Sequence, residues 1–266
     1  MKITQIRNAT LRVEYGGKIF IIDPWLAGKG ECGTFGDLPR EMGIEPTRPE
    51  MADIPYPLCD LPRAASEVIA GADAYLLTHL HPDHFDVDLA SGTGGAKLDK
   101  KTLIVVQNAE ESEFMARSGF EKIEILESEL RIGGVKITRA PSRHGTQEPC
   151  GPTMGLVLEA EGEKTLYIAG DTVWFEGVAD TLAQRKPGVV LLNACAAELK
   201  GFGRLIMDDA DVAKVYEAAP NAVIIASHLD VVPHATITRE SMRERLAKRG
   251  ILDKILIPND GETLEF

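Results

Sequence analysis

The sequence lacks the features of several specialised classes of protein. Its 266 residues contain no run of about 18 apolar residues, the length that a membrane-spanning helix needs. The first residues hold no apolar stretch typical of a secretory signal, and no internal repeat or low-complexity tract follows them. With 44% hydrophobic and 26% charged residues, the composition predicts a soluble globular protein rather than a disordered or fibrous one.

Cysteine and positive charge are also scarce. The four cysteines, Cys32, Cys59, Cys150 and Cys195, are scattered and form no CxxC pair. They predict packing roles and a reducing compartment, so we expect a cytoplasmic protein. Basic residues number 29 against 41 acidic ones, a net charge of −12, which disfavours binding to long nucleic acid or to a membrane. We expect a small-molecule substrate and leave a homo-oligomer open.

Short β-branched runs bounded by Gly or Pro recur along the chain and predict strands. They cover residues 2–6, 11–15, 18–22, 74–77, 103–106, 135–139, 155–159, 165–168, 189–192, 222–226 and 254–257. Helical patterns lie between them at residues 108–117, 175–185, 208–219 and 238–249. The pair Gly16-Gly17 predicts a hairpin turn. We expect a single domain over residues 1–266.

Residues 26–62 fit neither the strand nor the helix pattern. They are rich in Gly and Pro and carry Phe35 and Tyr56 among them. A long irregular segment in a compact domain is typically a binding loop or lid, so we predict a lid or insertion loop here. The alternative is a surface excursion that packs against its own body.

The stretch Thr78 to Asp86 carries the strongest chemical signal, HxHxDH, at His79, His81, Asp83 and His84. In an extended chain His79 and His81 point to the same side and can bind one metal ion. Asp83 and His84 follow a turn and can reach a second ion. The alternative, three hydrogen-bonded core histidines, is costly because neutral imidazoles and a carboxylate would be buried without a cation.

Three further residues follow the ends of predicted strands, where α/β sheets place their sites: His144, Asp171 and His228. Taken singly, each signal is weak, because a lone histidine is often structural and Asp171 could cap the next helix. Together with HxHxDH they make five histidines and two aspartates, which is an inventory for two metal ions.

This order of residues resembles the metallo-β-lactamase superfamily, and Asp23-Pro24-Trp25-Leu26 and Gly170-Asp171-Thr172 are similar to its ascorbate-6-phosphate lactonase-like branch. The resemblance covers nearly the whole chain and implies an α/β fold, a four-layer αββα sandwich. It implies that His79, His81 and His144 hold one metal, that Asp83, His84 and His228 hold another, and that Asp171 bridges both. Zn²⁺ is the expected metal, with Mn²⁺ as the alternative.

Such a site implies a metal-dependent hydrolase in which a hydroxide held by two metals attacks a small, anionic substrate, a lactone or a phosphorylated sugar derivative. One alternative is a phosphodiesterase acting on nucleotides or RNA. Another is a metal-binding protein without turnover.

Several residues are candidates for roles beyond metal binding. By resemblance Asp83 also shuttles protons, and Asp23 is a candidate to support a histidine ligand. His234 either protonates the leaving group or binds a substrate anion, or it is an ordinary loop histidine. Arg143 and Trp174 are candidates to bind substrate, with solvent exposure and core packing as their respective alternatives.

Overall fold

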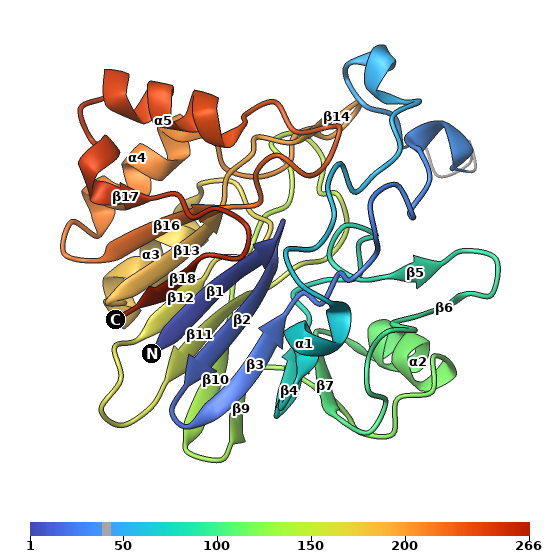
Figure 1. Ribbon diagram of the computed structural model, residues 1–266. Helices are drawn as coiled ribbons and strands as arrows, with labels where there is room; N and C mark the ends of the chain where they lie inside the picture. Colours follow the sequence, from blue (N-terminus) through green and yellow to red (C-terminus); the bar gives the residue numbers. More distant parts are fainter. Residues whose placement is uncertain (39–43) are drawn as a thin grey trace.

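The computed structural model describes residues 1–38 and 44–266, in which two large sheets lie face to face (Figure 1). In order across the first sheet the strands are β18 (Thr263–Glu265), β1 (Lys2–Arg7), β2 (Thr10–Tyr15), β3 (Lys18–Ile22), β4 (Ala74–Leu76), β7 (Leu103–Val106) and β8 (Ile123–Ile125). Across the second they are β17 (Ile255–Leu256), β16 (Val223–Ser227), β13 (Val189–Asn193), β12 (Leu166–Ile168), β11 (Gly155–Glu159), β10 (Val135–Ala140) and β9 (Glu129–Ile132).

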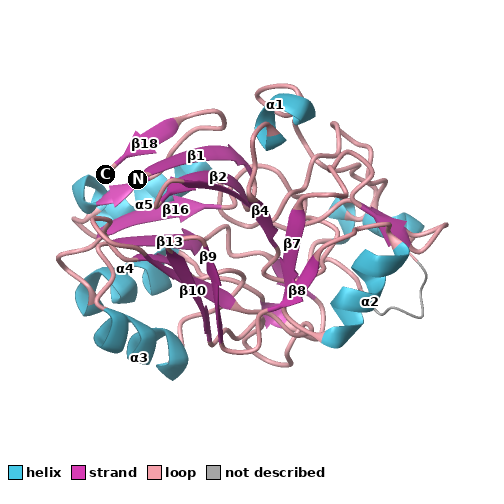
Figure 2. Ribbon diagram, turned by 90° about the horizontal axis from the view of Figure 1, so that it is seen from below, coloured by secondary structure: helices cyan, strands magenta, loops and turns pink. Residues whose placement is uncertain are grey.

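Helices cover the outer face of each sheet (Figures 1 and 2). The first sheet carries α1 (Ala65–Ile69) and α2 (Ala109–Arg117), and the second carries α3 (Glu176–Arg185), α4 (Asp209–Ala218) and α5 (Arg239–Lys248). The architecture is therefore the predicted four-layer αββα sandwich. Two small ribbons, β5–β6 (Val87–Asp88 and Thr93–Gly94) and β14–β15 (Glu198–Leu199 and Gly203–Arg204), lie outside the large sheets.

The alternation of side chains along β13 shows how the layers are held together. Val189 and Leu191 point into the core between the sheets, whereas Val190 and Leu192 point to the core under the helices. Successive side chains of a strand face opposite sides, and both sides here are covered. That is why this strand, parallel to both neighbours, is apolar and buried along its length.

The predicted strands and the four predicted helices are all present, with ends within about two residues of the expected ones. The sequence analysis missed β8, β9, β18, α1 and the strands of the two small ribbons. These are short elements, most with exposed or half-buried positions, so they lack an apolar period long enough to stand out. The predicted hairpin turn is confirmed, because Gly16 and Gly17 join β2 to β3 with φ of 56° and 73°.

The segment 26–62 packs against the body of the protein, although residues 39–43 lie outside the described part. Its described residues include the 3₁₀ helices Phe35–Asp37 and Pro49–Met51. The fully buried guanidinium of Arg7 donates to the main-chain oxygens of Trp25, Ala27 and Cys59. These contacts hold the described part of the segment, called the insertion below, against the body of the protein, while its role as a lid or insertion loop stays a prediction.

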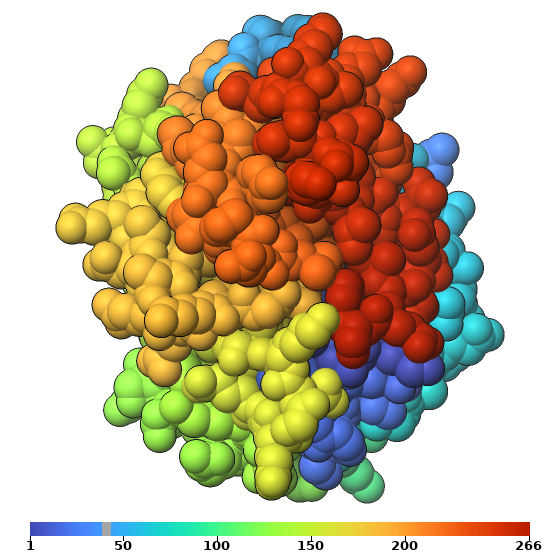
Figure 3. All heavy atoms as spheres, turned by 90° about the vertical axis from the view of Figure 1, so that its left-hand side faces the viewer, coloured from blue at the N-terminus to red at the C-terminus, as the bar shows by residue number. Residues whose placement is uncertain are grey.

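The two chain ends lie side by side on one face (Figure 3). β18 pairs antiparallel with β1, and the N-terminal ammonium of Met1 donates to the carbonyl of Phe266 at 3.1 Å. In the described part of the chain, none of the helices combines the length and the apolar character required to span a membrane.

The hydroxyl of Tyr15 tests how tightly the sheets are joined. It lies on β2 and is 2.9 Å from the carbonyl oxygens of Leu158 and Lys164, across the interface. Tyr15→Phe should lower the free energy of unfolding by about 1–2 kcal/mol, because a buried carbonyl loses its donor. Urea denaturation measures this, and Tyr216→Phe is the control, since no described residue hydrogen-bonds to that hydroxyl. Equal midpoints for the two variants would contradict the expectation.

Candidate active site

Four loops that follow strand ends converge at one edge of the sandwich. The loop after β4 carries four of the predicted ligands, and the loops after β10, β12 and β16 carry one each. The structure brings all seven predicted ligands together: His79, His81, Asp83, His84, His144, Asp171 and His228. Their donor atoms fall into three overlapping groups, within each of which the atoms lie within 4.8 Å of one another.

The first group consists of His79, His81 and His144. Nε2 of His144 lies 3.3 Å from Nδ1 of His81. Nδ1 of His144 lies 3.1 Å from the carbonyl oxygen of Leu205, to which it donates in the tautomer assigned from this contact. The lone pair of Nε2 is then directed at its neighbours. Nε2 of His79 is buried and has no hydrogen-bond partner among the described residues.

The second group consists of Asp83, His84 and His228. The Nε2 atoms of His84 and His228 are 3.2 Å apart, and Nε2 of His228 is 3.3 Å from Oδ2 of Asp83. Both imidazoles are completely buried. Such closely opposed ring nitrogens and a carboxylate oxygen need a positive charge among them.

Asp171 lies between the two groups. Its Oδ2 is 3.3 Å from Nε2 of His84 and 3.7 Å from Nε2 of His144. Its Oδ1 accepts a hydrogen bond of 2.7 Å from the amide of Asn193. The alternative that Asp171 caps the following helix is wrong, because the N-cap of α3 is Phe175.

Asp23 supports the second group, as the sequence analysis considered. Its buried carboxylate accepts from Nδ1 of His84 at 2.9 Å and from the main-chain N–H and hydroxyl of Thr78 at 2.7 and 2.8 Å. The contact with His84 fixes the ring and leaves Nε2 as the donor atom facing the cluster.

Two contacts of His228 were missed from the sequence. The amide of Asn8, in the turn between β1 and β2, lies 3.0 Å from Nε2 of His228. The thiol of Cys195 lies 3.4 Å from Nδ1, so the expectation of a mere packing role is wrong for this cysteine. An asparagine in a turn and a single buried cysteine carry no distinctive sequence pattern, so only the tertiary structure reveals these contacts.

The carboxylates of the cluster favour the protonated, positively charged form of a neighbouring histidine. Burial alone would lower the pKa of His84, yet Asp171, Asp23 and Asp83 raise it to about 10. For His81, burial and the neighbouring His144 outweigh the opposing effect of Asp83 and Asp171 and lower its pKa to about 3. The cluster therefore combines neutral imidazoles, which are metal ligands, with carboxylates that need a cation.

The donor set fits divalent cations in geometry as well as in chemistry. Tetrahedral ligation with bonds near 2.0–2.1 Å separates neighbouring ligand atoms by about 3.4 Å. The closest separations within the cluster are 3.2 and 3.3 Å, and those from Oδ2 of Asp171 reach 3.9 Å. Imidazole and carboxylate ligands suit Zn²⁺ and also Mn²⁺ or iron.

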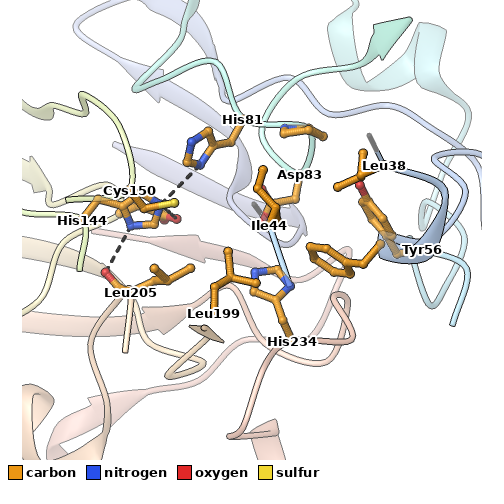
Figure 4. Close-up of a pocket in the computed structure, with 13 residues that line it drawn as sticks. Leu38, Ile44, Tyr56, His81, Asp83, His144, Cys150, Leu199, Leu205 and His234 are labelled. Atoms are coloured by element: carbon orange, nitrogen blue, oxygen red, sulfur yellow. Dashed lines mark hydrogen bonds and ion pairs between the residues drawn. The ribbon is translucent and has the colours of Figure 1, made fainter. Parts of the chain in front are cut away.

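A small cavity of about 60 Å³ opens beside the cluster (Figure 4). His81, Asp83, His144 and Asp171 form one side of it. The rest is largely apolar and is lined by Phe35, Leu38, Ile44, Tyr56, Pro82, Cys150, Leu199, Leu205 and His234. No Lys or Arg of the described residues lines this cavity.

His234 reaches the cavity, whereas Arg143 and Trp174 do not. Burial lowers the pKa of His234 to about 4, so its imidazole is neutral at pH 7 rather than the cationic acid that an ordinary pKa would allow. Arg143 is exposed, with a guanidinium nitrogen 3.4 Å from the carbonyl of Thr146. Trp174 is half-buried and packs against the core under the helices of the second sheet.

Comparison with known proteins agrees with this geometry. The family described as beta-lactamase superfamily domain matches residues 52–229. The chain is 36% identical to the UPF0173 protein YddR of Bacillus subtilis (strain 168), with both chains covered completely. A UPF0173 metal-dependent hydrolase of Azorhizobium caulinodans is 24% identical, again over 100% of both chains.

A solved structure extends the similarity to three dimensions. The crystal structure of isothiocyanate hydrolase from Delia radicum gut bacteria superimposes with a TM-score of 0.88 at 36% identity, covering 100% of this chain and 99% of that chain. The chain therefore belongs to the beta-lactamase superfamily and is a metal-dependent hydrolase with the metallo-β-lactamase fold.

Proposed function

We propose that this protein hydrolyses small, neutral, apolar electrophiles of the isothiocyanate class, with two divalent cations held in its His/Asp cluster. The observation that carries the proposal is the apolar cavity directly beside that cluster. A relative of known structure, an isothiocyanate hydrolase at 36% identity over the whole chain, supports the same chemistry.

The metal positions follow the two groups of donors. His79, His81 and His144 would hold one cation, Asp83, His84 and His228 the other, and Asp171 lies where it would contact both. Zn²⁺ is our first choice for this donor set. Bound cations would supply Lewis acidity and would lower the pKa of a coordinated water from about 15.7 to roughly 7.

Asp83 is the residue of this cluster best placed to handle a proton. Its side chain lines the cavity and keeps 13% of its surface accessible, whereas His84 and His228 are buried completely. A carboxylate at this place can accept a proton from the attacking water and return it to the product.

The substrate chemistry matches an apolar, water-poor cavity. The central carbon of R–N=C=S is electrophilic and the group carries no net charge. Addition of water gives the thiocarbamic acid R–NH–C(=O)–SH, which breaks down to the amine R–NH₂ and carbonyl sulfide. A small, largely apolar cavity of this kind suits the reacting group and a small apolar substituent.

Phosphorylated sugars and nucleotides fit less well than the sequence analysis expected. A phosphate normally binds through Arg, Lys or helix N-termini, and none of the described lining residues is Lys or Arg. Only the metal cluster itself would then offer positive charge. A lactone, which is neutral, remains the relevant comparison substrate.

A panel of substrates tests the proposal. We expect the zinc-loaded protein to convert benzyl isothiocyanate to benzylamine, detected by chromatography. The value of kcat/KM should exceed those for bis(p-nitrophenyl) phosphate and a sugar phosphate by about 100-fold or more, because the cavity leaves their charged oxygens unpaired. A phosphodiester or a lactone turned over faster than the isothiocyanate would contradict the assignment.

Metal content tests the ligand assignment. We expect about two equivalents of metal per chain by elemental analysis. His81→Ala and Asp171→Ala should each lower the content by about one equivalent and remove most activity, with unchanged circular dichroism. Arg143→Ala is the control, because this exposed side chain lies away from the cluster. Two full equivalents in both ligand variants would refute the assignment.

The role of Asp23 in metal affinity can be separated from its effect on the fold. Asp23→Asn removes the charge beside Nδ1 of His84 and should weaken metal binding by about 10-fold, measured by competition with a chelator. The control is Asp73→Asn, another hydrogen-bonded aspartate, which pairs with Lys18 far from the cluster. Equal affinities in the two variants would mean that Asp23 serves the fold alone.

A further inference from the structure

His234 lines the cavity, and its ring carries an unused hydrogen-bonding group. Its side chain is 9% exposed and its ring packs edge-on against Phe35, with the ring centres 5.1 Å apart. Nδ1 is buried without a hydrogen-bond partner among the described residues, and no described side chain or main-chain group bonds to either ring nitrogen. In Figure 4 the ring shares the cavity with His81, His144 and Asp83. A neutral imidazole always carries one N–H, and this one lacks an acceptor.

Hydrogen bonds from two other segments hold the main chain around His234. Arg48, in the insertion 26–62, donates from one guanidinium nitrogen to the carbonyls of Pro233 and Ala235, at 3.1 and 2.5 Å. The carbonyl between them, that of His234 itself, accepts from the N–H of Glu198 at 3.1 Å. Three consecutive carbonyls are thus engaged by two different segments of the chain.

The described part of the insertion is tied both to this loop and to the neighbouring residues of β14. The N–H of Leu58 donates to the carbonyl of Val231 at 2.8 Å, and the N–H of Lys200 donates to the carbonyl of Glu45 at 2.9 Å. The hydroxyl of Thr47 lies 3.3 Å from a carboxylate oxygen of Glu198. Because of these ties, the main chain that carries His234 is held by residues remote in sequence from it, and the ring itself packs against Phe35 of the insertion.

We propose that His234 is a catalytic residue that donates a hydrogen bond to the substrate heteroatom on which negative charge develops as water adds, and that Arg48 is a positioning residue that acts through it. The inference rests on the proposed function, because it takes the nitrogen or sulfur of an isothiocyanate as the acceptor. The imidazole acts as a neutral donor and keeps its proton. A fixed donor aimed at developing charge needs no reorganisation during the reaction.

Substitutions at His234 separate the hydrogen bond from the shape of the residue. His234→Gln keeps an N–H donor and should retain kcat within about 10-fold, whereas His234→Leu lacks a donor and should lose about 100-fold in kcat. Both variants should retain the metal content of the wild-type protein. Benzyl azide, a linear and hydrolytically inert mimic, should bind His234→Leu at least ~3-fold more weakly by calorimetry, a readout independent of turnover.

Arg48→Ala tests the positioning role. It should lower kcat/KM by about 10-fold in the wild-type background and cause no further loss in the His234→Leu background, since coupled residues are not additive. The matched control is Arg12→Ala, because Arg12 likewise donates to two main-chain oxygens, those of Val68 and Ala70, far from the cavity. The control should leave kcat/KM unchanged.

The outcomes distinguish this inference from the proposed function. Wild-type protein that turns over benzyl isothiocyanate, with His234→Leu equally active, would overturn the role of His234 and leave the proposed function standing. Equal losses from Arg48→Ala in both backgrounds would overturn the positioning role. Metal-loaded wild-type protein without isothiocyanate turnover would overturn the proposed function and this inference with it.

Discussion

The structure depends on how negative charge is accommodated at the edge where the two sheets end. Asp23, Asp83 and Asp171 are placed among five imidazoles with little access to water. Isolated carboxylates at such a place would be costly, and only positive charge or several hydrogen bonds make them tolerable. Asp23 is satisfied by three hydrogen bonds, whereas Asp83 and Asp171 face the imidazoles directly. This arrangement is suited to a bound cation, which would also offset the repulsion among candidate ligands that four loops bring close together.

The fold provides rigid support for that cluster. Strands β4, β12 and β16 lie in the interiors of the two sheets, and each leads straight into a loop that carries ligands. Backbone strain is concentrated here too, because Asn8, Asp23 and His228 all adopt left-handed conformations that non-glycine residues rarely take. Such strain persists only where surrounding contacts fix it, and all three side chains make hydrogen bonds within the cluster. The two sheets therefore support a site in which the backbone is strained at these three residues but held in one conformation.

The insertion contributes part of the apolar wall of the cavity beside the cluster. Phe35 and Tyr56 come from residues 26–62, stack with their ring centres 5.5 Å apart, and turn an apolar surface toward the metal ligands. In the function proposed above, the His/Asp cluster would set the type of reaction, and this wall would set which molecules reach it. Selectivity for neutral substrates would follow from the wall, since an unpaired charge is costly in apolar surroundings. Arg48 ties the insertion to the loop of His234. The insertion therefore contributes apolar side chains to the cavity wall and also helps to position the loop that carries His234.

Local sequence was enough to predict most of the strands, the main helices and four of the candidate metal ligands. Strand alternation and helix caps are short-range patterns, and HxHxDH places four ligands within six residues. The resemblance to a known superfamily added His144, Asp171 and His228 in their roles. The contacts of Asn8 and Cys195 with His228, the neutral state of His234, and the absence of Arg143 and Trp174 from the cavity wall could not be predicted in this way. Each depends on which loops meet in space and how deeply they are buried, and long-range packing decides both.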